Sequence, residues 1–240
     1  MRINKYLALK ANFSRREADR AIKDGRIKIG GRIAKLGDQV IRERVSIDDK
    51  FLVVKKYVYL AFNKPSGIIT SGAHWDQKAI KNILKFSIPV HPVGRLDKDS
   101  TGLILLTNDT RVTDALLGPE TNNQKEYIVS VNRPVTDKFL DAMKAGVDIS
   151  VIARSGATRQ SKTKKTIASK VGVKKFKIIL TEGKNRQVRK MCETLDYRVQ
   201  KLERVRILNI RLKDLQPGEH RVLGGVELAR FLKEIGLEKK

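Results

Sequence analysis

The sequence is short of cysteine and of long apolar runs, and each shortage excludes a class of protein. Cys192 is the only cysteine, which excludes an intramolecular disulfide and a zinc cluster built on several thiolates. No stretch approaches the roughly 20 apolar residues of a membrane-spanning helix. We also expect no signal peptide, because no long apolar stretch follows the first charged residues. These absences favour a cytoplasmic protein.

Acidic residues are also scarce. The 240 residues contain 51 Lys and Arg against 26 Asp and Glu, which leaves a formal net charge of +25. A surplus of this size and sign gathers polyphosphate, so nucleic acid is the expected partner, with an anionic membrane surface as the alternative. The chain is long enough for one large domain or for a small and a medium domain.

The first fifty residues read as a separate unit of helix, helix and hairpin. The segment NKYLALK predicts a short amphipathic helix. In SRREADRAIKDG, Ser14 and Glu17 have the spacing of a capping box, and Gly25 suits the left-handed residue that ends a helix. Gly30 and Gly31, between the isoleucine-rich arms of RIKIGGRIA, predict a tight hairpin.

Basic residues recur on one face of the second predicted helix. Arg16, Arg20 and Lys23 follow one another at spacings of four and three, and Arg15 lies beside them. The alternative is a solvated helix face, which the net charge makes less favoured. We therefore predict that this face contacts RNA phosphates.

The N-terminal motifs resemble the S4 RNA-binding domain. The resemblance is carried by RINKYL, SRREADRAI, GRIKI and GRI in this order, and it implies structured RNA as the ligand. The connecting segment DDKFLVVKKY contains neither proline nor glycine. We place the boundary there, with an S4-like domain over residues 1–55 and a second domain over 56–240.

The second domain mixes strand and helix patterns. The segments YVYLAFNK, KEYIVSV and KKFKIIL are rich in β-branched or alternating apolar residues, whereas DKFLDAMKAGV and NRQVRKMCETL have helical periodicity. This mixture predicts an α+β fold with a mixed, largely antiparallel sheet flanked by helices.

The stretch HPVGRLDKDSTGLILLTNDT places two carboxylates directly before an apolar run. The run GLILLT predicts a strand buried on both faces, so Asp97 is anchored at the edge of a rigid core. Gly94 permits a bend, and Arg95 supplies positive charge two residues away. A carboxylate held near arginine stays ionised at neutral pH. From chemistry alone, turn capping or a structural ion pair remains the commoner explanation of such an aspartate.

Four segments together resemble one enzyme family. NKPSG at 63–67, GRLDKDSTGLILLTND at 94–109, KEY at 125–127 and LTEGKNRQVRKM at 180–191 occur in its order. The chain is similar to pseudouridine synthases that carry an S4 domain and modify ribosomal RNA, most of all to the large-subunit (23S) branch. The alternatives are a synthase of 16S rRNA or of tRNA, and a non-catalytic RNA-binding or ribosome-assembly factor.

The resemblance implies roles for individual residues. Asp97 matches the aspartate that acts at the ribose C1′, whereas the neighbouring Asp99 matches no functional position and is expected to be a turn residue. Tyr127 matches the tyrosine that stacks on the detached uracil, and Leu180 an aliphatic residue that packs against the base. Arg189 matches the basic residue paired with the aspartate. Arg186 is close enough along the chain to take this part instead, and we expect both arginines near the substrate, with Arg95.

The sequence predicts no cofactor and no metal. Isomerising uridine to pseudouridine neither adds nor removes atoms, and the chain contains no Walker loop, dinucleotide fingerprint or zinc spacing. Its histidines, His74, His91 and His220, are scattered and are expected to be surface or hydrogen-bonded residues. Ribosomal RNA with a flipped-out uridine is the expected partner, and a monomer is the expected state.

A second set of basic residues lies between Arg154 and Lys190, where Glu182 is the only acid. Its members Lys174, Lys175 and Arg186 are predicted to form a basic wall beside the cleft that contacts phosphates. Lys64 is predicted either to contact RNA or to be an ordinary surface lysine.

The segment NRQVRKMCETL predicts a helix that Asn185 caps. Arg186 and Arg189 would then share one face, with Val188 and Cys192 turned inward. Cys192 is therefore expected to be a core residue and not a nucleophile.

Overall fold

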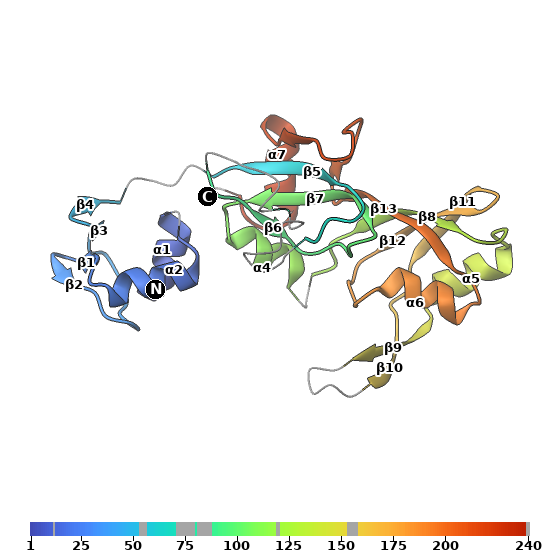
Figure 1. The fold of residues 1–240 in the computed structure, drawn as a ribbon, viewed down its shortest axis with the longest axis horizontal. Coiled ribbons are helices and arrows are strands. Elements are labelled where there is room, and N and C mark those ends of the chain that lie inside the picture. Colours follow the sequence, from blue (N-terminus) through green and yellow to red (C-terminus); the bar gives the residue numbers. More distant parts are fainter. Residues whose placement is uncertain are drawn as a thin grey trace.

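The computed structural model describes residues 1–11, 13–52, 57–70, 80, 88–118, 121–152 and 158–238. The N-terminal part contains two helices and one antiparallel sheet of strand order β2-β1-β3-β4, gathered at one end of the ribbon (Figure 1). Their bounds are α1 Ile3–Lys10, α2 Arg15–Lys23, β1 Ile27–Ile29, β2 Arg32–Ile33, β3 Val45–Ile47 and β4 Lys50–Phe51. A core of its own holds this part together, formed by residues such as Ile3, Leu7, Ala18, Ile22 and Ile27.

Local signals in this part form as predicted. The Ser14 hydroxyl accepts a hydrogen bond from the Glu17 backbone N–H at 3.2 Å, and the Glu17 carboxylate accepts one from the Ser14 N–H at 2.7 Å. This reciprocal capping box starts α2. Gly30 and Gly31 join β1 to β2 with φ angles of 57° and 86°, a conformation that suits glycine in a two-residue hairpin turn.

A nine-stranded sheet dominates the rest of the chain. Its strand order is β11-β12-β8-β13-β7-β5-β15, with β14 paired to β13 and β6 paired to β7. The bounds are β5 Tyr59–Lys64, β6 His91–Val93, β7 Thr101–Thr107, β8 Lys125–Val131, β11 Ile167–Gly172, β12 Lys175–Leu180, β13 Val199–Ile207, β14 Ile210–Arg211 and β15 His220–Val222. Only the β13–β7 pair is parallel among the pairs described. The predicted mixed, largely antiparallel sheet is therefore confirmed.

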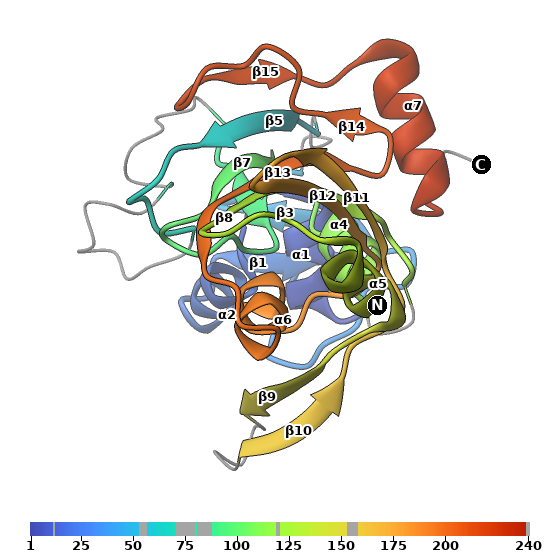
Figure 2. The same ribbon diagram turned by 90° about the vertical axis from the view of Figure 1, so that its right-hand side faces the viewer.

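Helices flank this sheet. Their bounds are α4 Arg111–Leu117, α5 Asp137–Ala145, α6 Gln187–Thr194 and α7 Gly225–Glu234. Phe139 and Met143 of α5 share a core with Met191 and Cys192 of α6 and with strand residues such as Phe176. The helices α4 and α7 pack in another core with β5 and β7, and Figure 2 shows α7 on the other side of the sheet from α5 and α6. Burial of these apolar faces is the main stabilising term of the fold.

A separate hairpin projects from this body. The strands β9 (Asp148–Ile152) and β10 (Thr158–Lys162) form a two-stranded antiparallel sheet that extends away from the main sheet in both views (Figures 1 and 2). The Lys190 Nζ of α6 donates to the Ser150 carbonyl oxygen at 2.7 Å, which ties the hairpin to the helix.

The strand that follows Asp97 is almost entirely enclosed. Six of the seven residues of β7, Gly102 to Thr107, are buried, which confirms the prediction of a strand covered on both faces. In the described part of the chain, no helix combines the length and apolarity needed to cross a bilayer.

Candidate active site

A cavity of about 920 Å³ opens beside the start of β7. Its lining includes the loop 92–98 with Ser100, the segment 180–188 and residues of β8 and β13, and also Thr70, Lys164 and the end of α4. Asp97 belongs to this lining, and 30% of its side chain is exposed. A volume of this size is typical of a ligand pocket, so the carboxylate is open to a ligand.

The loop that carries Asp97 is fixed by hydrogen bonds on both sides of it. Thr70 donates through Oγ1 to the Leu96 carbonyl oxygen at 2.8 Å and accepts from the Leu96 N–H at 3.0 Å. The Ser100 N–H donates to the Asp97 carbonyl oxygen at 3.0 Å, which closes a turn. Thr70 had no signal in the sequence, because its partner lies 26 residues away.

Lys64 is buried, and not at the surface where both predictions had placed it. Its side chain is fully buried, and Nζ donates to the carbonyl oxygens of Pro65, Ile68 and Lys98 at 2.9, 2.7 and 3.2 Å. Burial lowers the pKa of Lys64 to about 8, while the charges of Asp99 and Asp97 act to raise it. Both alternatives, an RNA contact and a surface lysine, are therefore wrong: Lys64 supports the backbone behind the cavity.

Two arginines approach Asp97. Arg186 Nη1 lies 3.7 Å from Asp97 Oδ2, and Arg189 Nε lies 4.0 Å from the same oxygen. Arg186 is 43% exposed in its side chain and Arg189 only 10%. The sequence left open which of them accompanies Asp97, and the structure brings both to it, one from the surface and one from the core.

The start of α6 differs from the prediction. The helix begins at Gln187, and its N-cap is Arg186 in the left-handed conformation with φ 50°, without a capping side chain. Asn185 therefore does not cap the helix. The left-handed residue turns Arg186 out of the helix path, whereas Arg189 lies within α6, so the two reach Asp97 from different directions.

Two predicted neighbours of Asp97 are exposed. Arg95 lines the cavity, but the ion pairs of Asp97 within the described residues are those with Arg186 and Arg189. The predicted substrate contact of Arg95 stays a prediction. Asp99 lies in an exposed turn, as predicted.

The sheet forms the floor of the cavity. Tyr127 of β8 pairs with Ile178 of β12 on one side and with Arg204 of β13 on the other. Leu180 pairs with Lys125, two residues before Tyr127. Residues directly opposite one another in neighbouring strands point to the same face, and Tyr127, Leu180, Lys125 and Arg204 all line the cavity.

Lys125 and Arg204 are floor residues without a separate signal in the sequence. Burial lowers the pKa of Lys125, and the positive charge of Arg204 lowers it further. Lys125 Nζ donates to the Asn123 carbonyl oxygen at 3.1 Å. The sequence of β13 does not identify Arg204 as a site residue, because the side chains that Arg204 contacts depend on how β13 pairs with its neighbouring strands.

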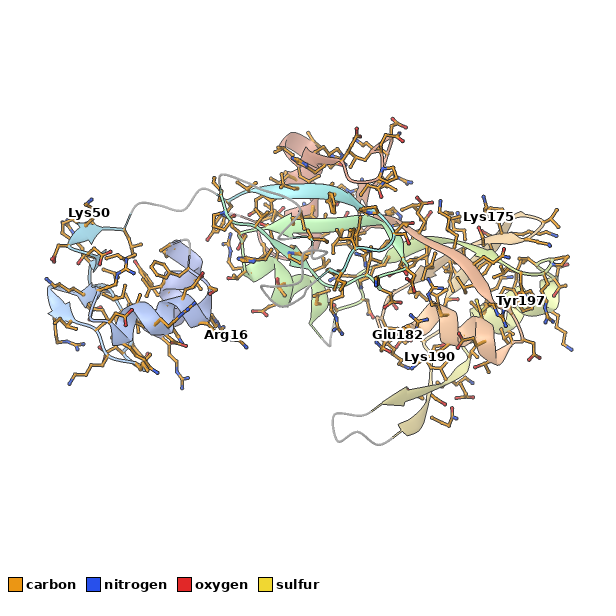
Figure 3. All side chains as sticks on the ribbon, viewed as in Figure 1. Arg16, Lys50, Lys175, Glu182, Lys190 and Tyr197 are labelled. Carbon is orange, nitrogen blue, oxygen red and sulfur yellow. The ribbon has the colours of Figure 1, made fainter. Side chains whose placement is uncertain are left out.

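The predicted basic wall divides into two groups. Arg186 lines the cavity together with Lys164 and Lys184. Lys174 and Lys175 are exposed at the opposite end of β12 from Leu180, about 17 Å away at the usual rise of a strand. Figure 3 shows Lys175 far from Glu182, which lines the cavity. Their prediction as part of a wall beside the cleft is wrong, since the strand separates them from it. Arg154 lies outside the described residues.

The remaining predicted residues lie as follows. Arg15, Arg16, Arg20 and Lys23 are all exposed on α2, and Figure 3 shows Arg16 extending from this helix. Cys192 is buried, and burial raises its pKa to about 12, which confirms a core residue.

His91 and His220 are exposed, and His74 lies outside the described residues. Within the part that the structure describes, no group of three or more His, Cys, Asp and Glu residues is arranged to hold a metal ion.

Two known families match this chain. The family described as RNA pseudouridylate synthase matches residues 58–194, and the S4 domain matches residues 1–43. The chain is 39% identical over 238 residues to the dual-specificity RNA pseudouridine synthase RluF of Salmonella typhi, covering 98% of this chain and 79% of that protein.

Two further relatives extend the match. The chain is 30% identical over 237 residues to the ribosomal large subunit pseudouridine synthase B of Bacillus subtilis, covering 96% of this chain and 95% of the relative. A solved structure described as a pseudouridylate synthase superposes with a TM-score of 0.67 at 25% identity, covering 98% of this chain and 99% of that chain. The chain therefore belongs to the RNA pseudouridylate synthase family, as an enzyme with an S4 domain at its N-terminus.

Proposed function

We propose that this enzyme converts a uridine of large-subunit ribosomal RNA to pseudouridine, with Asp97 acting at the ribose C1′. The observation that carries the proposal is the partly exposed carboxylate of Asp97 in a cavity, with Arg186 Nη1 at 3.7 Å and Arg189 Nε at 4.0 Å. In the reaction the N1–C1′ bond breaks, the uracil turns, C5 bonds to C1′, the C5 proton leaves and N1 takes up a proton.

Asp97 meets the demands of the first step. Positive charge develops at C1′ as the glycosidic bond breaks, and a fixed carboxylate stabilises this charge or bonds to the carbon. Arg186 and Arg189 place positive charge beside the carboxylate. The hydrogen bonds of Thr70 with Leu96 hold the loop, so little reorganisation is needed when the substrate arrives.

Tyr127 and Leu180 suit the base. Both line the cavity, and the aromatic ring offers a stacking surface to a uracil that has left its helix. In this proposal the tyrosine hydroxyl accepts or relays the C5 proton. Leu180 supplies an apolar contact for the ring.

Extruding a uridine from folded RNA costs a few kcal/mol of lost stacking and pairing. Phosphate contacts elsewhere offset this cost, and the chain offers two exposed sets: the α2 arginines with Lys23, and the cations at the cavity mouth. We assign the first set to an S4 domain over residues 1–55 and the second to a catalytic domain over residues 56–240. The proposed enzyme is a cytoplasmic monomer.

The choice of RNA draws on the relatives. The Bacillus subtilis relative is named for the large ribosomal subunit, and the Salmonella typhi relative for dual specificity. We therefore propose large-subunit rRNA as the main substrate and include tRNA in the assay. Mapping pseudouridines in total RNA from cells with and without the gene tests this directly. A site in large-subunit rRNA that disappears without the gene is expected, and an unchanged map would refute the proposal.

Asp97→Asn tests the assigned carboxylate, and Asp99→Asn is its matched control. Both residues lie in the same loop, but Asp97 lines the cavity and Asp99 is exposed. We expect Asp97→Asn to abolish pseudouridine formation while RNA affinity stays largely intact, and Asp99→Asn to retain the wild-type rate. Substantial turnover by Asp97→Asn would exclude the proposed role.

A further inference from the structure

Arg204, a buried arginine in the cavity floor, has one N–H group without a hydrogen-bond acceptor among the described residues. Arg204 is 4% exposed, and its Nε donates to the Leu103 carbonyl oxygen at 2.7 Å. Its Nη2 is buried and has no hydrogen-bond partner within the described chain. Most buried donors in proteins are paired, so this nitrogen requires an explanation.

Arg206, two residues along the same strand, shows the ordinary arrangement. Its Nε donates to Glu126 Oε2 at 2.8 Å, its Nη1 to the Leu208 carbonyl oxygen at 2.8 Å and its Nη2 to Gln124 Oε1 at 3.3 Å. Arg204 lines the cavity and Arg206 does not. The arginine with the unpaired nitrogen is therefore the one whose side chain borders the cavity.

The strand register sets Arg204 beside the proposed base site. Arg204 lies directly opposite Tyr127 in β8 and opposite Gly102 in β7. Gly102 contributes no side chain, and the Arg204 backbone occupies the place where its Cβ would lie, so β7 and β13 approach closely at this point. Ser100, just before β7, also lines the cavity, and its buried Oγ likewise lacks a partner.

The charge of Arg204 is not neutralised by a neighbour. Among the described residues, no carboxylate lies within 4.0 Å of its guanidinium, and Lys125 places a second cation close enough to act on it electrostatically. The cations of the cavity floor therefore bind best to a ligand atom that accepts a hydrogen bond and that carries or gains negative charge.

We infer that Arg204 hydrogen-bonds a carbonyl oxygen of the flipped-out uracil and stabilises the negative charge that the ring gains when it detaches. This inference rests on the proposed roles of Asp97 and Tyr127. When N1–C1′ breaks, the bonding electron pair stays on N1 and is delocalised to O2 and O4. When C5 attacks C1′, this pair forms the new C5–C1′ bond. A base then takes the C5 proton, the C5–H pair returns to the ring, and N1 takes up a proton. A donor that binds more strongly as charge develops accelerates the step.

A phosphate is the less suitable acceptor. Phosphates remain on the backbone at the cavity mouth, where Lys164, Lys184 and the half-exposed Arg186 offer cations. Arg204 is buried in the floor, opposite the tyrosine on which the base is proposed to stack. The ring of a flipped-out nucleotide therefore suits this position better than a phosphate does.

The test pairs protein variants with atom-substituted RNA. Short large-subunit rRNA fragments carry uridine, 2-thiouridine or 4-thiouridine at the mapped site, because sulfur is a poor hydrogen-bond acceptor. Single-turnover rates are measured for wild type, Arg204→Met, Arg204→Lys and the control Arg206→Met. Thermal unfolding and RNA affinity show whether each variant is folded.

We expect Arg204→Met to lower the single-turnover rate on uridine about 100-fold with RNA affinity within about threefold of wild type. One of the two thio substitutions should slow the wild type and Arg206→Met but leave Arg204→Met unchanged, because the contact is already lost. Arg204→Lys should recover part of the rate and part of the thio effect.

Two results would overturn the inference. In the first, thio effects in Arg204→Met equal those in the wild type, so that protein and RNA changes act independently. In the second, folded Arg204→Met keeps the wild-type rate on uridine. Either result leaves the role of Asp97 standing, whereas turnover by Asp97→Asn would remove the proposed function itself.

Discussion

Replacing Gly102 by alanine combines a strained backbone with a backbone collision. Gly102 has φ +100°, and a Cβ there would lie 2.3 Å from the Arg204 carbonyl oxygen and 2.8 Å from the Arg204 nitrogen. The parallel strands β7 and β13 must separate to admit it. A side chain at positive φ costs about 1–2 kcal/mol, and overpacking adds about 1–3 kcal/mol. The expected loss in free energy of unfolding is therefore about 2–5 kcal/mol.

Gly218→Ala is the matched control. Gly218 has φ +92°, and nothing lies within 4 Å of its added Cβ, so this variant carries the dihedral strain without the collision. It should lose only about 1–2 kcal/mol. Urea unfolding measures both variants, and the melting temperature of Gly102→Ala should fall by roughly 4–20 °C.

The collision also has a functional consequence. Moving β13 from β7 displaces Arg204 from its bond to the Leu103 carbonyl oxygen. The activity of Gly102→Ala, measured per folded molecule at a temperature where it is stable, should therefore fall, while Gly218→Ala remains at the wild-type level. Equal losses of stability in the two glycine variants would refute the reasoning, since the close approach of the strands would then cost nothing.

Three further predictions follow from burial and charge. Because the pKa of Lys64 is lowered to about 8 in the fold and is near 10.5 in an unfolded chain, the unfolded state binds more protons between these values. The free energy of unfolding should therefore rise with pH from about 8 to 10.5, by at most about 3 kcal/mol. Urea titrations of Lys64→Met should lack this rise, and an identical pH profile would contradict it. Lys174 and Lys175 lie away from the cavity but are exposed cations, whereas Arg186 lines it. Charge reversal of any of the three should weaken binding to every RNA sequence and reduce the salt slope by about one for each lost phosphate contact. An unchanged slope would remove that residue from the RNA interface. Cys192, whose pKa burial raises to about 12, should react with a thiol reagent only at the rate of unfolding, and rapid labelling of the native enzyme would show that it is not enclosed.

Local structure was largely predictable from the sequence. The capping box of Ser14 and Glu17 and the hairpin turn at Gly30 and Gly31 form as expected, because their hydrogen bonds and dihedral preferences involve residues a few positions apart. The apolar run before Thr107 likewise identified a strand buried on both faces. Helix ends were less secure: Asn185 resembles a cap, yet the chain turns through a left-handed Arg186 instead.

The site was predictable only in part. The motif around Asp97 pointed to the carboxylate and the family, and its position in a cavity agrees with that. Lys64 was misplaced because burial of its ammonium depends on three carbonyl groups that converge from two separated segments. Lys174 and Lys175 were misplaced because closeness in sequence to Arg186 says nothing about which end of β12 faces the cavity.

The sequence by itself determined the two-part organisation, the α+β class, the family and the identity of the candidate nucleophile. These depend on composition, on short-range patterns and on motifs that a linear chain displays directly. Tertiary structure alone decided that Arg186 and Arg189 both approach Asp97 and that Arg204 lies opposite Tyr127. Strand register and long-range packing create these neighbourhoods, and they join residues tens of positions apart, which no local pattern encodes.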